Sequence, residues 1–453
     1  MSPWAASLQI HGDRLGFVGG PLDQRVTYRE MADRIGDISD SLNQAGVVAG
    51  SVVAFPGQYS VDNVAMLLAL ADRKAIAVPL PADAEPRIER LMAIARATHR
   101  VSASAESSGT VAAVSVAAIS GADGGHPLYR QLSAAAHAGL VLFTSGTTGD
   151  PKAAVQDLDR LRLRYAQPRD VGMMLAFMHI DHIGGINTVL YVLSHGGTLV
   201  VPKSRSPHDV AAAIAEHHIE VLPVSPTFLN LMLLSGAVER FDLSSLRRIT
   251  YGSEPMPQSV LDRVADRLPG VELLQTYGTT ELGILKSKSE SNGSLWMKVG
   301  GDGYETKVVA GRLWVRAQTA MLGYLNAESP FDAEGFMDTG DEVEVRGEWL
   351  RVLGRKADFI NVGGVKVSPV EVESVLLEMA CVAEVAVFGR AHPMMGQIVE
   401  ARVRLTDEST LSDFKRKMQD HCRNRLPPQA VPAKVTLTSA SMVTERFKRD
   451  REG

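Results

Sequence analysis

The pattern of hydrophobic and polar residues predicts a first long helix over residues 27–46. Apolar side chains recur there at spacings of four, three and four, which places them on one helix face: Met31, Ile35, Ile38 and Leu42. Thr27, with Glu30 three residues later, has the pattern of a capping box. Gly46 suits the C-terminal end of the same helix.

Short apolar runs alternate with helical patterns through the next two hundred residues. Residues 51–55 and 75–80 read as buried strands, and the helical pattern of residues 61–73 lies between them. The same rhythm returns with strands at 196–202 and 220–226 around a helix at 209–218. Alternation of this kind predicts an α/β fold whose sheets are largely parallel.

Three segments depart from this alternation of strands and helices. Residues 101–125 are low in charge and rich in small side chains, which indicates a weak strand and loops. Residues 311–318 alternate in polarity, as expected of a more antiparallel sheet. After Gly354 a compact α+β lobe is expected, with strands and helices in the runs 383–390, 397–405, 410–426 and 433–438. Ser368 and Pro369 are predicted to begin a helix in this lobe, with Glu371 completing a capping box.

Length and composition limit the class of protein. A chain of 453 residues is too long for one ordinary core, so two or three packed subdomains are expected. Hydrophobic residues make up 45% and charged residues 22%, as in soluble globular proteins, and the formal charge of −5 does not favour nucleic-acid binding. Cys381 and Cys422 imply no disulfide framework. With no signal-peptide pattern and no apolar run long enough to span a membrane, we expect a cytoplasmic protein.

The run LFTSGTTGDPK, residues 142–152, carries the strongest chemical signal. Glycines expose backbone N–H groups, hydroxyl side chains add donors, and a lysine supplies positive charge, so the run predicts an anion site. Its candidate ligand-binding residues are Thr144, Ser145, Gly146, Thr147, Thr148 and Lys152. The Walker-type loop is excluded, because the glycine preceding Lys152 lies three residues back and Ala153 stands where Ser or Thr is required.

Further motifs follow in order: YGTTE at 277–281, TGD at 339–341 and GRKADFINVGGVKVSPVEVE from Gly354. Together with the 142–152 run, they resemble the adenylate-forming superfamily of acyl-CoA synthetases, peptide-synthetase adenylation domains and luciferases. The resemblance extends from about residue 27 to Lys448. It implies a large N-terminal domain over 1–354, with mostly parallel sheets, flanking helices and a small β subdomain. A hinge at 355–358 and a small mobile α+β domain over 359–453 would follow.

The resemblance also implies roles for individual residues in binding ATP. Thr280 is expected at the α-phosphate, and Glu281 at Mg²⁺, which prefers hard oxygen ligands. Asp341 resembles the ribose-binding acid of the family, and Arg355 the arginine that joins it. The adenine is expected to lie against a further set: Gly252, Ser253, Glu254 and Tyr277, with Gly278 a candidate for the pocket lining.

His182 is expected in the acyl pocket. It lies where amino-acid-activating relatives place an aspartate that pairs with the substrate ammonium, so a free amino acid is disfavoured. Tyr251 and Met256 are further candidates for the pocket lining. His179, Asp181 and His182 are also suitable metal ligands. The metallo-hydrolase pattern is less favoured, because Phe177 stands where another histidine is needed.

The last part of the chain is expected to take part in both half-reactions of the family. VTERFKRD resembles the TxxGK ending, which makes Lys448 the lysine that stabilises the adenylation transition state. Phe447 replaces the usual glycine, and a basic frayed tail is the alternative interpretation. Gly364 and Lys366 resemble the loop that forms the thioester tunnel. Ala357 departs from the residue types that are common at the hinge.

The sequence therefore predicts an ATP-dependent carboxylic acid–CoA ligase, which forms an acyl adenylate and then a thioester, releasing AMP and pyrophosphate. ATP, Mg²⁺ and coenzyme A are the expected cofactors, and an acyl or aryl acid is the expected substrate. Two alternatives stay open. One is an enzyme that loads the acyl group onto a separate carrier protein, and the other is a non-catalytic nucleotide-binding homologue.

Overall fold

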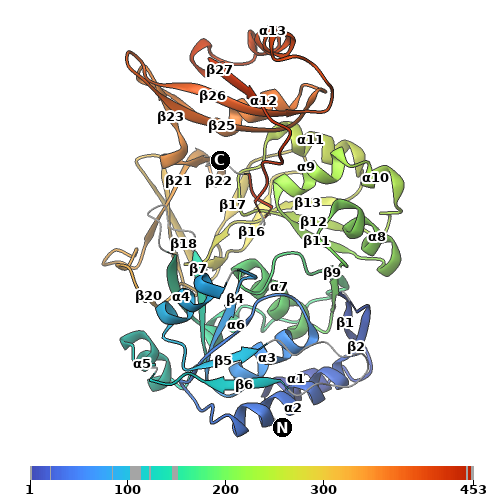
Figure 1. Ribbon diagram of the computed structural model, residues 1–453, viewed down its shortest axis with the longest axis vertical. Coiled ribbons are helices and arrows are strands. Elements are labelled where there is room, and N and C mark those ends of the chain that lie inside the picture. The colour runs from blue at the N-terminus through green and yellow to red at the C-terminus, as the bar shows by residue number, and fades with distance from the viewer. Residues whose placement is uncertain are drawn as a thin grey trace. The chain divides into compact units, whose positions relative to one another are not determined.

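The computed structural model describes residues 3–20, 22–83, 85–102, 114–121, 124–144, 151–444 and 447–449 (Figure 1). The chain forms two compact units. Unit 1 comprises residues 1–223, 278–284 and 316–335. Unit 2 comprises residues 224–277, 285–315 and 336–453.

One sheet of unit 1 has the strand order β20-β8-β7-β4-β3-β5-β6. Its parallel centre consists of β7 (Gly139–Thr144), β4 (Ile76–Leu80), β3 (Val52–Pro56) and β5 (His99–Ser102). Antiparallel strands complete the edges: β8 (Lys152–Asp157), β20 (Gly323–Tyr324) and β6 (Ser115–Ala118). The predicted strands at 51–55 and 75–80 are confirmed within one residue.

Five strands form the other sheet region of unit 1, in the order β11-β9-β10-β1-β2. They are β11 (Val221–Val224), β9 (Met173–Leu175), β10 (Thr198–Val201), β1 (Leu15–Gly19) and β2 (Gln24–Thr27). All neighbours pair in parallel except β1 and β2. The predicted mostly parallel α/β fold is therefore confirmed, with antiparallel strands at the edges.

Helices pack around these strands and bury their apolar faces. They are α1 (Pro3–Gln9), α2 (Tyr28–Gln44), α3 (Val61–Asp72), α4 (Glu85–Ala95), α5 (Pro127–Ala134), α6 (Leu158–Leu163), α7 (Ile183–Ser194) and α8 (Pro207–His217). The capping box at Thr27 and Glu30 is confirmed, and the predicted apolar stripe of α2 is fully buried. None of the described helices is long and apolar enough to cross a membrane.

Unit 2 begins with the parallel pair β12 (Arg248–Tyr251) and β13 (Glu272–Gln275). Three helices accompany this pair: α9 (Pro226–Leu234), α10 (Ala237–Arg240) and α11 (Gln258–Arg267). A six-stranded sheet follows in the order β16-β17-β22-β21-β19-β18. Its strands are β16 (Ser287–Ser289), β17 (Met297–Val299), β22 (Trp349–Arg355), β21 (Met337–Arg346), β19 (Arg312–Ala317) and β18 (Tyr304–Val309). The antiparallel pairing of β19 with β21 confirms the prediction for residues 311–318.

The C-terminal lobe of unit 2 is the predicted compact α+β structure. It contains β23 (Ile360–Val362), β24 (Val365–Val367), α12 (Pro369–Leu377), β25 (Val382–His392), β26 (Gly396–Leu405), α13 (Leu411–Cys422) and β27 (Lys434–Leu437). Short 3-10 turns lie at Lys356–Asp358 and Pro428–Ala430. The capping box predicted at Ser368 is wrong. The Ser368 hydroxyl donates to the carbonyl of Leu353 instead of accepting a helix N–H.

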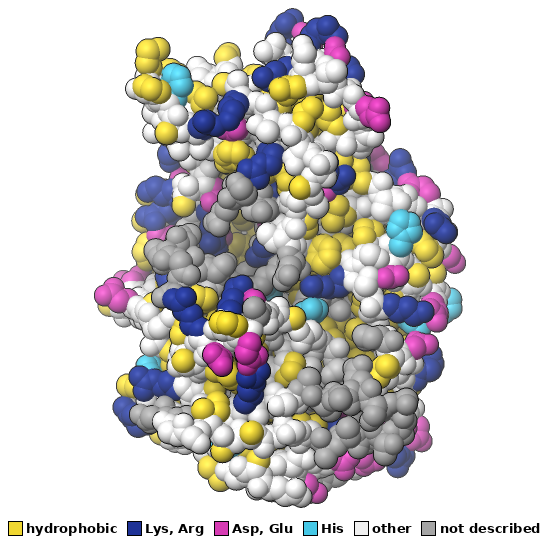
Figure 2. Space-filling view, viewed as in Figure 1, with side chains coloured by type: hydrophobic (Ala, Val, Ile, Leu, Met, Phe, Trp, Pro, Cys, Tyr) yellow, Lys and Arg dark blue, Asp and Glu magenta, His cyan; other side chains and the backbone are white. Residues whose placement is uncertain are grey.

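The segment 101–125 contains the weak strand that was expected, β6, and residues 103–113 and 122–123 lie outside the described residues. Among the described side chains on the face shown in Figure 2, those of opposite charge are interspersed and do not gather by sign. This distribution agrees with the small formal charge of −5.

Candidate active site

The predicted phosphate-binding run connects two antiparallel strands of unit 1. Thr144 ends β7 and lies directly opposite Lys152, which begins β8. The other predicted residues of the run, Ser145, Gly146, Thr147 and Thr148, lie outside the described residues. The described residues thus establish that both ends of the run are held in one strand pair.

A segment far along the sequence holds the start of β8 from its other side. Tyr324 of β20 pairs with Ala154, and Gly323 pairs with Val155. The Asn326 side chain accepts a hydrogen bond from the N–H of Ala153 (2.9 Å) and donates to the carbonyl of Pro151 (2.9 Å). One amide side chain therefore satisfies a donor and an acceptor at the exit of the run.

Thr280 and Glu281 lie at the turn of a tight hairpin in unit 1, formed by β14 (Gly278–Thr279) and β15 (Gly283–Ile284). A Cβ atom at Gly278 would lie 2.6 Å from the carbonyl oxygen of Gly283, so only glycine fits there. The Gln156 side chain, on β8, donates to the carbonyl of Thr280. This bond joins the turn to the strand that begins at Lys152.

Tyr324 contacts both Glu281 and Lys152. Its hydroxyl donates to Glu281 Oε1 at 2.6 Å, and the Lys152 ammonium lies 5.4 Å from the centre of its ring. A cation over an aromatic face is attracted by the electron-rich ring. Unit 1 therefore presents an ordered set made of Lys152, Tyr324 and Glu281, in which the tyrosine sets the position of both charges.

His182 is the N-cap of α7, where its Nδ1 accepts from the N–H of Gly184 at 3.1 Å. A Cβ atom at Gly185 would lie 2.0 Å from the carbonyl oxygen of His179, so the helix begins in close contact with the preceding turn. The Tyr59 hydroxyl donates to the Gly185 carbonyl (3.1 Å), and burial, with a contribution from Asp181, raises the pKa of Tyr59 well above its usual value. The histidine is thus fixed at a helix N-terminus.

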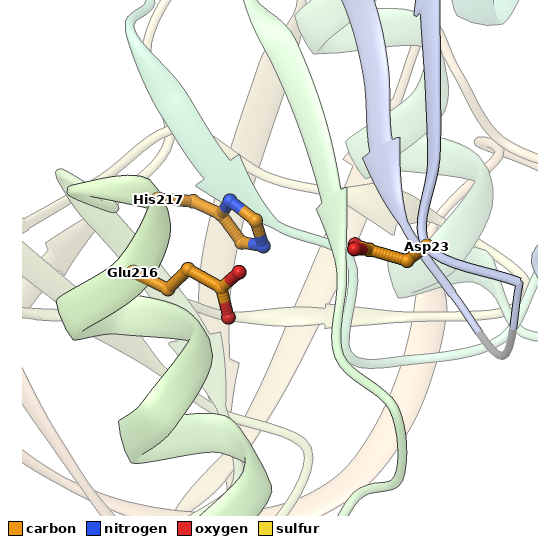
Figure 3. A group of neighbouring side chains, drawn as sticks. All are labelled: Asp23, Glu216 and His217. Carbon is orange, nitrogen blue, oxygen red and sulfur yellow. The ribbon is translucent and has the colours of Figure 1, made fainter.

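The metal interpretation of residues 179–182 gains no support from the structure. Among the described residues, the ligand atoms that lie within 4.8 Å of one another belong to a different group: Asp23, Glu216 and His217 (Figure 3). Asp23 follows β1 while the other two end α8, and Figure 3 shows the three side chains converging. Both acids are exposed, and exposed acidic groups of this kind are common without a bound ion.

A small cavity adjoins α7 in unit 1. Its walls include Ile183, Ile186 and Leu190 of the helix, together with Ile284 that follows the Thr280 turn. The Tyr165 hydroxyl, also at this cavity, donates to Asn187 Oδ1 at 2.8 Å. Arg164 and Thr319 also line the cavity, so its walls are part apolar and part polar.

In unit 2 a buried carboxylate lies at the end of a strand pair. Asp341 of β21 pairs with Arg355 of β22, and the Arg355 Nε lies 3.7 Å from Asp341 Oδ1. The Tyr277 hydroxyl donates to Asp341 Oδ2 at 2.5 Å, and the Asp341 N–H donates to Thr339 Oγ1 at 3.2 Å. The structure therefore brings together three residues that the sequence assigned to the nucleoside.

Burial raises the pKa of the Asp341 carboxyl above its usual value of 3.8, although the Tyr277 hydroxyl and Arg355 act in the opposite direction. The pKa of Tyr277 is raised as well, first by burial and then by the Asp341 charge, so its hydroxyl keeps its proton and donates. This pair leaves one carboxylate oxygen of Asp341 beside the Arg355 guanidinium.

Gly252, Ser253 and Glu254 follow β12. A Cβ atom at Gly252 would lie 2.5 Å from Thr276 Oγ1, and Ser253 adopts a φ of 71°, which is unusual for a residue with a side chain. Glu254 Oε1 accepts from the N–H of Thr227 at 2.8 Å, and its Oε2 accepts from the N–H of Arg449 at 3.2 Å. Glu254 therefore contacts the C-terminal tail, which the sequence did not indicate.

The two candidate regions of the C-terminal lobe are both ordered by local bonds. Lys448 closes a turn with Thr444, whose N–H donates to the Lys448 carbonyl at 2.8 Å. The N–H of Gly364 donates to Asn361 Oδ1 (3.0 Å), and Lys366 Nζ lies 3.0 Å from Glu342 Oε1. Lys366 is thus paired with the residue that follows Asp341.

Sequence reasoning missed Tyr324, Asn326 and Gln156. Their neighbourhood, GYLN at 323–326, gives no motif by itself, since its role arises only when β20 pairs with β8. Gln156 has a weak signal: it is an amide in an otherwise apolar strand, KAAVQD, and is completely buried. Its Nε2 donates to the Thr280 carbonyl, whereas its buried Oε1 has no hydrogen-bond partner among the described residues.

Comparisons with known proteins identify the family of the chain. The chain matches the AMP-binding enzyme family over residues 4–325 and the AMP-binding enzyme C-terminal domain over residues 371–448. It is 29% identical to an indoleacetate–CoA ligase of Aromatoleum aromaticum, with 86% of this chain and 85% of that protein covered. It is 26% identical to the long-chain-fatty-acid–CoA ligase FadD13 of Mycobacterium tuberculosis, with 94% and 91% covered.

Solved structures show the same fold. The anthranilate CoA ligase AuaEII in complex with anthranoyl-AMP superposes with a TM-score of 0.81 at 21% identity, covering 99% of this chain and 95% of that one. The o-succinylbenzoate CoA synthetase of Bacillus subtilis superposes with a TM-score of 0.76 at 21% identity, covering 100% and 97%. At this level of identity the likeness concerns the fold alone.

Proposed function

Since the chain belongs to the AMP-binding enzyme family and is an ATP-dependent acid–CoA ligase that works through an acyl adenylate, we propose that its preferred substrate is an aromatic carboxylic acid. The relative named for indoleacetate supports this choice. His182 is assigned to the acyl side and gives no fixed negative charge for an ammonium group.

The contacts of Tyr324 with Lys152 and Glu281 are the main support for placing the ATP phosphates next to these residues. Adenylation concentrates negative charge on the phosphates, and preoriented donors lower its barrier. Lys152 supplies positive charge and Thr280 a hydroxyl at the α-phosphate. Thr144, at the end of β7, is the described residue of the run that is proposed to contact the remaining phosphate oxygens.

Glu281 is the proposed ligand of Mg²⁺. The fit is supported by the chemistry of the side chain, a hard oxygen donor that is partly exposed and whose Oε1 is oriented by the Tyr324 hydroxyl. When bound, the ion would neutralise part of the phosphate charge. Glu281 would hold the ion, and the Tyr324 hydroxyl keeps the Glu281 carboxylate in one orientation.

Asp341 and Arg355 are the proposed ribose-binding pair, with Gly252, Ser253, Glu254 and Tyr277 toward the adenine. A carboxylate accepts from both ribose hydroxyls, as in other nucleotide sites. Tyr277 occupies one oxygen of Asp341 and thereby directs the other. Arg355 stands immediately before the 3-10 turn Lys356–Asp358, which supports a hinge at 355–358 between domains 1–354 and 359–453.

The reaction proceeds in two balanced steps. A carboxylate oxygen of the acid attacks the α-phosphorus, a new P–O bond forms, and the bond to pyrophosphate breaks. Lys448 is the proposed stabiliser of the charge on the α-phosphate in this step. The thiol of coenzyme A then attacks the acyl carbon, loses its proton, and displaces AMP. Gly364 and Lys366 are the proposed neighbours of the thiol carrier in this second step.

Pyrophosphate release tests this function. Wild type would be assayed with aromatic, aliphatic and amino acids, with and without coenzyme A, and the products identified as thioesters by mass. We expect turnover with one or more aromatic acids and formation of the coenzyme A thioester. Release without that thioester would favour delivery to a carrier protein. Tight ATP binding without release from any acid would contradict the function and favour the non-catalytic alternative.

A further inference from the structure

The tail segment, of which the structure describes residues 443–444 and 447–449, bears Lys448, and its described residues close a turn. The Thr444 N–H donates to the Lys448 carbonyl (2.8 Å), and the Lys448 N–H donates to Thr444 Oγ1 (3.1 Å). Val443 and Arg449 form an antiparallel bridge at the base of this turn. The backbone of Lys448 therefore follows wherever the base of the turn is held.

Phe447 fastens the turn to helix α9 of unit 2. Its ring lies edge-on to the buried Phe228 ring, with centroids 5.2 Å apart, and its carbonyl accepts from Ser225 Oγ at 2.5 Å. Phe447 has a φ of 53°, a region that favours glycine and disfavours bulky residues. A glycine would relieve this strain but would lose the ring contact. Phe447 therefore adopts an unfavourable backbone conformation and gains a ring contact with Phe228.

Arg449 holds the other side of the turn. Its guanidinium pairs with Glu373 of α12, a carboxylate with no solvent exposure, while its own side chain is only 11% exposed. The second oxygen of Glu373 accepts from the N–H of Val387 at 3.0 Å. A buried carboxylate that loses its cation is costly, so this pair selects one position of the tail.

The backbone of Arg449 makes a third attachment. Its N–H donates to Glu254, whose other oxygen accepts from the first turn of α9. Arg449 therefore joins α12 of the C-terminal lobe to the segment that follows β12, and it is the direct neighbour of Lys448. Because the link uses side chains and one N–H, it can be broken without unfolding any strand.

We propose that Arg449 is a positioning residue for Lys448: its pair with Glu373 and its bond to Glu254, together with the Phe447 anchor, hold the backbone of Lys448 in one position within unit 2, and adenylation depends on that position. This inference rests on the proposed role of Lys448 in the first half-reaction. Arg449 touches no reacting atom. Its loss therefore acts on the adenylation step and spares the attack of the thiol on an adenylate that is already formed.

Half-reaction assays on the full chain test this inference. Adenylation is measured by exchange of labelled pyrophosphate into ATP, and thioester formation by supplying the acyl adenylate and coenzyme A. Arg449→Ala is expected to slow adenylation on the order of 10- to 100-fold, the effect of a small misplacement of a catalytic group. Thioester formation stays close to wild type, the KM for ATP is little changed, and Arg449→Lys recovers part of the rate.

Matched variants separate positioning from general damage. Arg416→Ala removes an exposed arginine of α13 in the same lobe and should leave both half-reactions unchanged. Phe447→Gly removes the anchor without leaving Glu373 unpaired, and it should slow adenylation even if Arg449→Ala does not fold. Thermal unfolding of each variant shows whether a loss of rate follows a loss of structure.

Two results would overturn the inference: unchanged adenylation in Arg449→Ala and Phe447→Gly, or an equal loss in both half-reactions. Lys448→Ala distinguishes this failure from failure of the proposed function. If Lys448→Ala loses adenylation while the neighbouring variants do not, only the positioning role is wrong. If Lys448→Ala keeps adenylation, the role assigned to the lysine itself is wrong.

Discussion

The two regions that bear the lysines proposed for phosphate binding and adenylation are held in different ways. Lys152 begins β8, which is paired with β7 on one side and β20 on the other, so its backbone is fixed by strand hydrogen bonds. Lys448 lies in a turn of the tail segment, which is attached by the Phe447 anchor and the Arg449 contacts. Strand pairing holds the first lysine, whereas side-chain contacts and single hydrogen bonds hold the second.

The difference matches the two parts of the proposed reaction. A group that binds phosphates throughout the cycle benefits from a rigid base, because preoriented donors need no reorganisation. A group needed for one step only must leave without unfolding a sheet. Side-chain contacts at a chain end meet that requirement.

The largest expected effect is at Lys448 in the tail segment. Lys448→Ala removes the charge that is proposed to stabilise the adenylation transition state, and we expect exchange of pyrophosphate into ATP to fall about 100- to 1,000-fold, as for loss of one preoriented donor. The matched control is Lys417→Ala, which removes an exposed lysine of α13 in the same lobe. Equal rates in the two variants would place adenylation elsewhere.

Asp341 sharpens the comparison, because it belongs to unit 2 but is held by strands as Lys152 is. Asp341→Asn keeps the shape of the side chain and removes its charge. Hydrogen bonds to a charged group contribute about 1.5–3 kcal/mol, so the KM for ATP should rise on the order of 10- to 100-fold. Steady-state kinetics should show a much smaller change in the KM for the acid.

The same residue gives a pH dependence with a defined sign. Burial raises the pKa of Asp341 above 3.8, and only the ionised carboxylate accepts from both ribose hydroxyls. The KM for ATP should therefore increase as pH falls toward this raised pKa. The increase should be absent in Asp341→Asn. A pH profile that the substitution leaves intact would assign the titration to another group.

Tyr324→Phe tests whether the rigid region depends on one hydroxyl. The ring under Lys152 stays, but the bond to Glu281 is lost, which amounts to about 1 kcal/mol and a fivefold loss of adenylation rate. Because Glu281 loses the hydroxyl that orients it, a titration of activity with Mg²⁺ should give a higher half-saturating Mg²⁺ concentration than wild type. An unchanged Mg²⁺ curve would separate Tyr324 from the metal role of Glu281.

The smallest effect is expected for Asn326→Ala. Strand pairing on both sides of β8 remains, so the rate should fall only about two- to threefold, as for one modest hydrogen bond. Hydrogen exchange at the N–H of Ala153, which loses its acceptor, should accelerate clearly. A large loss of activity would show that strand pairing alone does not fix the loop.

The sequence predicted the elements whose signals are local. A capping box and apolar periodicity predicted α2, and the YGTTE and TGD motifs marked residues that meet in the structure, such as Tyr277 and Asp341. The roles of Tyr324 and Asn326 depend on β20 joining β8 across more than 150 residues, which no local pattern reports. The Ser368 capping box failed because the hydroxyl found a tertiary acceptor, the Leu353 carbonyl. Phe447 departs from the glycine of the TxxGK ending, and its ring packs against Phe228, which the motif could not indicate.

The most direct test of this division is to supply Lys448→Ala with the acyl adenylate and coenzyme A, and to measure thioester formation in a single turnover. The account predicts a rate within about twofold of wild type, because the lysine acts only before the adenylate exists. A loss as large as that in pyrophosphate exchange would contradict it, since the tail segment would then serve both steps.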